Sequence, residues 1–111
     1  MKYFMVKEIE WLPIKKWEDL YLISSNGDIY SKKSKKILVN NIRGMYHCVT
    51  LSRNKYKEKH SVHRLVAINF IPNPENKPCV NHKNGIKNDN RVENLEWCTY
   101  SENEIHSFVV L

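Results

Sequence analysis

The sequence predicts an α+β protein in which a small antiparallel β unit is followed by a helix and a compact strand–loop–strand–helix unit. Three observations lead to this fold class. A hairpin turn signal lies between two β-prone runs, apolar residues change to helical spacing in the middle of the chain, and two short strand-like runs precede a helix start near the C-terminus. With 111 residues, the chain has the length of one domain with a modest core.

The β unit is expected between Tyr21 and His60. Its clearest signal is Ser25-Asn26-Gly27, which is flanked by the runs YLIS and DIYS. Asn-Gly between β-prone runs favours a hairpin, because both residues tolerate the positive φ angles of a tight turn. Further strands are predicted in KILV, YHCVTLSR and KYKEKHSVH, with NIRG as a loop between the first two.

The second half of the chain changes to helical periodicity. Apolar residues at helical spacing predict an amphipathic helix over Val62–Ile71, and the prolines that follow end it. The runs CVNH and NLEWCT are predicted strands joined by a loop over Lys83–Glu93. Ser101, followed three residues later by Glu104, is typical of a capping box and predicts the start of a last helix.

The charge of the chain indicates a nucleic-acid partner. Eighteen Lys and Arg residues against twelve Asp and Glu give a net charge of +6 and a pI near 9.3. The excess is concentrated in Ser31–Lys36 and Arg53–Arg64, which favour a phosphate backbone, although solvated turns remain the alternative for each stretch alone. The candidate DNA contacts are Lys32, Lys33, Lys35, Lys36, Arg53, Lys55, Lys57 and Arg64.

Other classes of protein are disfavoured. The apolar runs are far shorter than a membrane span, and we find no signal peptide, so we expect an intracellular, cytoplasmic protein that does not bind a membrane. Cys48, Cys79 and Cys98 are odd in number and form no CxxC pair, which argues against a disulfide framework or a four-cysteine zinc site. We expect them to be buried small side chains on strands.

The segment CVNHKNGIKNDNRVENLEWCTYSEN holds six asparagines around one histidine. The predicted elements place His82 at a strand end, Asn94 at the loop exit and Asn103 in the first turn of the last helix. A neutral His that activates water, beside amide oxygens that ligate a hard cation, is a plausible site for phosphodiester hydrolysis. The remaining amides of the segment are expected to be turn residues: Asn84, Asn88 and Asn90.

The same residues resemble a known family. VHRLVAINFIPNPENKPCVNHKNGIKNDNRVENLEWCTYSEN, over Val62–Asn103, is similar to the HNH homing endonucleases of phages and mobile introns, through HRLVA, the NH pair, NLEW and EN. The stretch EWLPI…YLISSNGDIYS resembles a modular DNA-binding motif often found just upstream. The resemblance implies a β-rich DNA-binding motif over residues 8–60 and a ββα-metal (HNH, His-Me) nuclease finger over residues 61–111.

The resemblance also implies roles for single residues. His82 would be the general base, and Asn94 the middle asparagine that fixes the loop and so orients His82. Asn103 would ligate a divalent ion that stabilises the leaving 3′ oxygen, with Mg²⁺ expected and Mn²⁺ or Zn²⁺ left open. Asn81 stands where many members have Asp as the other metal ligand, which is a departure from the family pattern. His106 is a secondary candidate for metal or phosphate.

We therefore expect a metal-dependent DNA endonuclease, encoded by a phage or mobile element and acting in the host cell. Because family members often carry a further DNA-binding segment after the finger, we expect weak sequence specificity or a homodimer. One alternative is a DNA-binding protein with a degenerate, inactive HNH fold, which the amide at Asn81 favours. A structural zinc module is a weaker alternative, because the cysteines lack ligand spacing.

Overall fold

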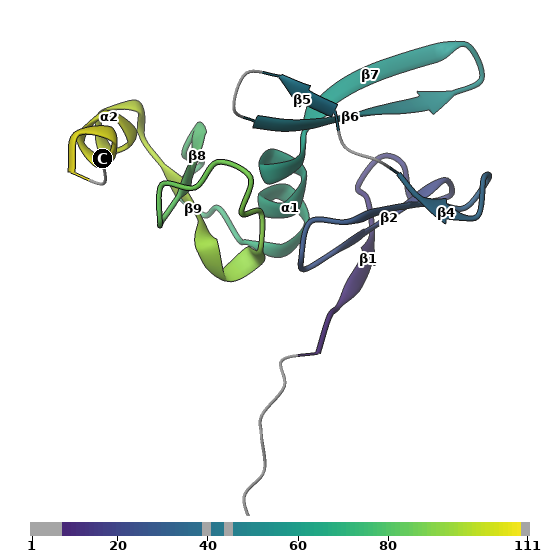
Figure 1. Ribbon diagram of the computed structural model, residues 1–111, viewed down its shortest axis with the longest axis horizontal. Helices are drawn as coiled ribbons and strands as arrows, with labels where there is room; N and C mark the ends of the chain where they lie inside the picture. The colour runs from purple at the N-terminus through teal and green to yellow at the C-terminus, as the bar shows by residue number, and fades with distance from the viewer. Residues whose placement is uncertain (1–7, 39–40, 44–45, 110–111) are drawn as a thin grey trace, which may run out of the picture.

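The computed structural model describes residues 8–38, 41–43 and 46–109, with the side chains of 41–43 and 106–109 left out of the description. These residues form an α+β fold with three antiparallel sheets and two helices, as the sequence predicts (Figure 1). The first sheet has the order β1 (Trp11–Pro13), β2 (Tyr21–Ser24), β3 (Ile29–Ser31) and β4 (Lys36–Ile37). The second contains β5 (Asn41–Arg43), β6 (Tyr46–Arg53) and β7 (Tyr56–Ser61). The chain continues through α1 (Val62–Phe70), β8 (Cys79–His82), the 3₁₀ turn η1 (Val92–Asn94), β9 (Leu95–Cys98) and α2 (Tyr100–Val109).

The predicted hairpin joins β2 to β3. Ile23 lies opposite Ile29, and the N–H of Ser24 donates to the carbonyl of Asp28 at 2.8 Å. Of the two turn residues, Gly27 adopts a positive φ, +90°, and Asn26 does not. A single left-handed residue is therefore enough to close this turn, where the Asn-Gly pattern predicted two. The three-residue strand β1 was not predicted, because it is too short to show a period.

The predicted antiparallel β unit consists of two sheets, β1–β4 and β5–β7. Within the NIRG segment, which was expected to be a loop, Asn41–Arg43 instead forms β5, in which Ile42 lies opposite His47 of β6. Asn and Gly are poor strand formers, so local propensity favoured a loop here. Pairing with the long strand β6 overrides that propensity by satisfying the backbone of the segment.

One hydrophobic core joins the N-terminal sheet, β6, α1 and the β8–β9 hairpin. Helix α1 begins at Val62 and ends at Phe70, one residue short of the predicted end, and it buries Val62, Leu65, Val66 and Ala67. In Figure 1, α1 lies between the β8–β9 hairpin and the two N-terminal sheets. The buried cluster continues on both sides of α1 with Ile14, Trp17, Tyr21, Ile23, Ile29, Val49, Leu51, Val80 and Leu95.

Helix α2 begins through a capping box that differs from the predicted one. The N–H of Glu102 donates to Thr99 Oγ1 at 3.1 Å, and the N–H of Thr99 donates to Glu102 Oε1 at 2.9 Å. Ser101 and Glu104 instead lie exposed within the helix. Two overlapping Ser/Thr-x-x-Glu patterns occur here, and the one that directly follows the end of β9 forms the cap.

The three cysteines are free and lie on strands, as expected. Cys98 is buried, whereas Cys48 and Cys79 are half-buried. Across the described parts of the chain, neither helix has both the length and the apolar character that crossing a bilayer requires.

Candidate active site

His82 is the last residue of β8, and it lies in a group of three rings that come from three elements. Its imidazole centroid is 4.9 Å from that of His63 in the first turn of α1 and 6.0 Å from the ring of Tyr46 at the start of β6. Tyr46 and His63 stack on each other with centroids 5.2 Å apart. His82 is only 4% exposed, so the end of β8 places an ionisable ring in a nearly dry position.

Burial shifts both imidazoles toward the neutral form. Loss of hydration lowers the pKa of His82, and the hydrogen bond with Asn90 opposes this in part. Burial, together with the neighbouring His82 ring, lowers the pKa of His63 from 6.5 to about 4. A buried His that is neutral near pH 7 can accept a proton, which is the property that a general base needs.

The ring of His82 is held by Asn90, which the sequence assigned only to a turn. His82 Nε2 lies 2.8 Å from Asn90 Oδ1, and Asn90 is 5% exposed. An amide oxygen only accepts hydrogen bonds, so this contact requires the imidazole proton to be on Nε2. The basic lone pair of the neutral ring is then on Nδ1. No spacing pattern marked Asn90, since the contact is made across a loop.

Asn94 ties the two ends of the loop that follows His82. Its Oδ1 accepts from the N–H of Asn84 at 3.1 Å, and its Nδ2 donates to Asn84 Oδ1 at 3.0 Å and to the Asp89 carbonyl at 2.8 Å. The backbone carbonyl of Asn94 also accepts from the N–H of Lys83 at 2.7 Å. Asn94 is 5% exposed. This geometry is what a loop-fixing role for Asn94 requires.

Asn81 immediately precedes His82 on β8, so the two side chains leave the strand at neighbouring positions. It is 7% exposed, and its Nδ2 donates to Oε1 of Glu96, its partner on β9, at 3.0 Å. The bond orients the amide with its nitrogen toward the carboxylate, which makes Oδ1 the atom that could ligate a cation. Sequence reasoning did not single out Glu96.

The last predicted ligands lie on α2, the helix that packs against β8. Asn103 is half-buried in the first turns of α2, and its N–H donates to the Thr99 carbonyl at 3.0 Å. His106 belongs to the same helix, but its side chain is outside the described part of the chain. Among described residues, no group of three or more His, Cys, Asp or Glu could hold a metal.

The donors present are therefore rich in amide oxygen: Asn81 and Glu96 on the hairpin and Asn103 on α2. Mg²⁺ takes oxygen ligands, keeps several waters and needs only one or two protein groups besides the substrate phosphate. The donor set fits such a hard cation better than it fits Zn²⁺, which prefers nitrogen and sulfur.

The predicted basic residues are exposed, and three of them are engaged within the protein. Lys32 Nζ donates to the Glu18 carbonyl at 3.0 Å. Arg53 pairs with both carboxylate oxygens of Asp19, at 2.8 and 2.9 Å. Arg64 donates to the Pro78 carbonyl at 2.8 Å and lies 5.8 Å from the centroid of the Trp97 ring. These contacts fix the directions in which the two guanidinium groups point.

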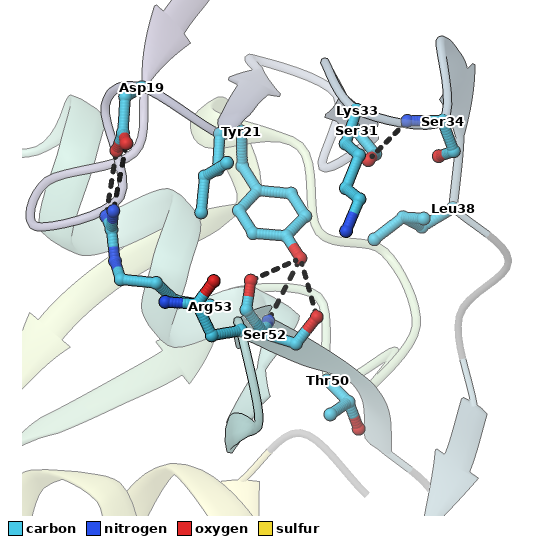
Figure 2. A pocket seen from close by; sticks show the side chains of 11 residues that line it. Asp19, Tyr21, Ser31, Lys33, Ser34, Leu38, Thr50, Ser52 and Arg53 are labelled. Atoms are coloured by element: carbon cyan, nitrogen blue, oxygen red, sulfur yellow. Dashed lines mark hydrogen bonds and ion pairs between the residues drawn. The ribbon is translucent and has the colours of Figure 1, made fainter.

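The two basic stretches meet at one hollow of about 740 Å³ between the N-terminal sheet and β6 (Figure 2). Lys33 from the first stretch and Arg53 from the second both line it. The Tyr21 hydroxyl joins the two sheets, because it accepts from the N–H of Ser52 at 2.9 Å and donates to the Ser52 carbonyl at 3.3 Å. Packing between sheets therefore brings together charges that lie about twenty residues apart in the sequence.

Comparison with protein families finds two matches that together span most of the chain. Residues 60–105 match the model described as HNH endonuclease, and residues 10–58 match the NUMOD4 motif. HNH nucleases generally depend on a divalent metal ion.

Individual relatives agree with these matches. The chain is 43% identical over 99 residues to an uncharacterized HNH endonuclease of Acanthamoeba polyphaga mimivirus, covering 85% of this chain and 30% of the relative. It is 40% identical over 96 residues to the DNA endonuclease I-HmuI of Bacillus phage SP01, covering 86% of this chain and 55% of the relative.

A solved structure that concerns DNA binding and cleavage by the HNH homing endonuclease I-HmuI also matches. Its TM-score is 0.84 at 38% identity, with 92% of this chain and 60% of that chain covered. This agreement confirms the fold class predicted from the sequence. The chain spans between about one third and three fifths of the length of these relatives.

Proposed function

Because the chain belongs to the HNH endonuclease family through residues 60–105 and carries a NUMOD4 motif over residues 10–58, we propose that it hydrolyses or nicks DNA with a divalent metal ion. The observation that carries this proposal is the buried His82, whose pKa is lowered by burial and whose ring, at the end of β8, is held through Nε2 by Asn90. A ring held in this way offers Nδ1 as the base.

In the proposed reaction, His82 takes a proton from a water molecule at Nδ1 while the water oxygen attacks the phosphorus and the bond from phosphorus to the leaving 3′ oxygen breaks. Desolvation lowers the pKa of His82, so the ring is unprotonated before the reaction and can accept this proton. Asn94 keeps the loop closed around His82 through its bonds to Asn84 and Asp89. Burial thus keeps His82 Nδ1 unprotonated, and Asn94 helps to keep it in position.

The metal ion would be held by Asn103 and Asn81, with His106 as a secondary candidate. When bound, a divalent ion supplies positive charge that stabilises the leaving oxygen. An amide at position 81 lacks the negative charge that an aspartate would carry there. Glu96 contributes a negative charge beside Asn81 and so replaces part of it. Oxygen donors favour Mg²⁺ as the working ion, with Mn²⁺ as the substitute.

The DNA backbone would contact the exposed basic residues of Ser31–Lys36 and Arg53–Arg64. Lys33 is the most informative of them, because it lines the hollow where the two stretches meet. Lys33→Ala should lower the slope of log K against log salt concentration by about the amount of one phosphate contact. Lys33→Arg should keep the wild-type slope. We also propose either weak sequence specificity or a homodimer on DNA, and sedimentation with and without DNA would test for the dimer.

The test of the reaction is cleavage of supercoiled plasmid with Mg²⁺, with Mn²⁺ or with chelator. Wild type should cut only with metal, and His82→Ala should cut about 10²- to 10⁴-fold more slowly, as expected for a lost general base. His60→Ala is the matched control, because His60 pairs with Glu58 on β7 outside the site. Unchanged cleavage by His82→Ala would contradict the assignment.

A second candidate function is DNA binding without cleavage. The amide at Asn81 favours it, because an amide binds a divalent cation more weakly than a carboxylate does. In that case wild type would shift DNA at low salt and cut nothing with either metal. The same plasmid assay, run beside a gel-shift titration, separates the two functions.

A further inference from the structure

We propose that Asn90 is a positioning residue that holds His82 in its Nε2-protonated tautomer, and that Gly27 in the N-terminal hairpin keeps Asn90 in place. The inference rests on the proposed function, since it concerns the same base. It adds that the N-terminal unit is a structural part of the active site as well as a candidate DNA contact.

The first argument comes from the buried pair itself. Asn90 Oδ1 and His82 Nε2 are 2.8 Å apart, and both side chains are at most 5% exposed. Water therefore cannot easily replace either partner, and a buried polar atom without a partner costs about 1–3 kcal/mol. With the amide oxygen toward the ring, the proton must be on Nε2 and the lone pair on Nδ1. With the amide reversed, the proton would be on Nδ1, and the base would be lost.

The second argument is the close approach of the N-terminal turn. Gly27 adopts a φ of +90°, and a Cβ at this residue would lie 3.0 Å from Asn90 Cβ and 3.2 Å from the Asn90 carbonyl oxygen. The same Cβ would lie 3.5 Å from Val62 Cγ1, at the start of α1. Real Cβ atoms rarely come so near to backbone, so only glycine allows this contact without a shift of Asn90.

A backbone hydrogen bond secures the same contact on its other side. The carbonyl of Ser25 accepts from the N–H of Val92 at 2.9 Å, two residues beyond Asn90. Ser25 is itself held, because its Oγ accepts from the N–H of Glu10 at 3.1 Å. The hairpin turn therefore meets the loop at Asn90 and again at Val92. The position of Asn90 is thus set by packing from outside its own loop.

The experiment reads the tautomer of His82 directly, from the ¹⁵N shifts of its ring nitrogens in long-range ¹H–¹⁵N spectra. It is run on the full chain without DNA, at a pH above the ordinary pKa of histidine. Wild type should show a protonated Nε2 and an unprotonated Nδ1. Asn90→Ala should give a mixture of tautomers, whereas the exposed Asn88→Ala should leave the wild-type pattern. A wild-type ring protonated at Nδ1 would overturn the inference.

Two further variants keep the test decisive if Asn90→Ala does not fold. Asn90→Asp retains an acceptor oxygen, so it should keep the Nε2-protonated tautomer and shift the Nε2 resonance. An unshifted Nε2 resonance in this variant would contradict the contact. Gly27→Ala should disturb the His82 tautomer, and Asn26→Ala, an exposed change in the same turn, should not. If both turn variants keep the wild-type pattern, Gly27 does not support Asn90.

Cleavage kinetics complete the design. Asn90→Ala should lower kcat by about 10- to 100-fold, the usual effect of losing a residue that orients a functional side chain, with KM for DNA little changed. Asn90→Asp should recover part of this loss. If the wild type cuts no DNA but shows the expected tautomers, the proposed nuclease function is contradicted and the positioning role of Asn90 stands. If His82→Ala loses cleavage but Asn90→Ala does not, only the positioning role of Asn90 is contradicted.

Discussion

Asn81 and Glu96 lie directly opposite each other on β8 and β9, and the Asn81 amide donates to the Glu96 carboxylate at 3.0 Å. The pair places an amide where many HNH enzymes have an aspartate, next to a carboxylate on the neighbouring strand. The negative charge on this face of the hairpin is therefore supplied by the partner strand.

Asn81→Asp should place two carboxylates opposite each other and destabilise the metal-free protein by roughly 0.2–1 kcal/mol, as like charges do in cross-strand pairs. Added Mg²⁺ should reverse this and stabilise the variant more than wild type, because bound metal stabilises the folded state. The measurement is Tm with chelator and with Mg²⁺. In Asn81→Asp/Glu96→Gln the metal-free penalty should disappear. A Tm of Asn81→Asp that does not respond to metal would contradict this location of the site.

The pH dependence of cleavage should follow the lowered pKa of His82. The active form of the ring is unprotonated, so kcat should rise with pH, and the midpoint of the rise should lie below 6.5, the ordinary pKa of histidine. Single-turnover cleavage at saturating metal over a pH series measures this limb. A limb centred well above 6.5 would show that burial does not control the ionisation of the base.

His63 should make the protein less stable in acid. Its pKa is lowered from 6.5 to about 4 in the folded state, so the unfolded chain binds this proton more readily. Stability from this group is complete above pH 6.5 and falls as the pH drops toward 4, by up to roughly 3 kcal/mol. Urea unfolding of His63→Phe, which keeps a ring against Tyr46, should show a shallower loss over this range. Parallel curves for the two proteins would contradict the prediction.

The two overlapping capping patterns make a direct comparison possible. Thr99→Ala should destabilise the protein by about 1 kcal/mol, because it removes the acceptor for the N–H of Glu102. Ser101→Ala should change the free energy of unfolding by less than about 0.5 kcal/mol, since this side chain is exposed on the helix. Urea denaturation of both variants provides the test. A larger effect at Ser101 would restore the capping box predicted from the sequence.

Local patterns predicted most of the fold. The turn at Asn26-Gly27, the helical spacing after Val62 and the run CVNH each depend on near neighbours, and each element lies where its pattern placed it. Strand β5 was missed because its stability comes from pairing with β6, which is a tertiary effect. The start of α2 was displaced because two capping patterns overlap, and the sequence alone does not rank them.

The candidate site divides in the same way. His82, Asn94 and Asn103 were singled out by motif spacing, and their catalytic or metal-binding roles remain predictions. Asn90 was taken for a turn residue because nothing in its spacing links it to His82. Its contact exists only once the loop folds back and the N-terminal turn packs against it. Side chains that act through such contacts are recognised from coordinates rather than from motifs.

The single core has a consequence for protein engineering. Helix α1 packs against both family segments, since its buried face and the N-terminal residues Ile14, Ile23 and Ile29 belong to one apolar cluster. If the nuclease finger were transferred alone, the apolar face of α1 would be exposed to solvent, and the chimera would tend to aggregate. Grafts onto another scaffold therefore need to transfer the two segments as one piece, so the functional unit of exchange is larger than the nuclease motif.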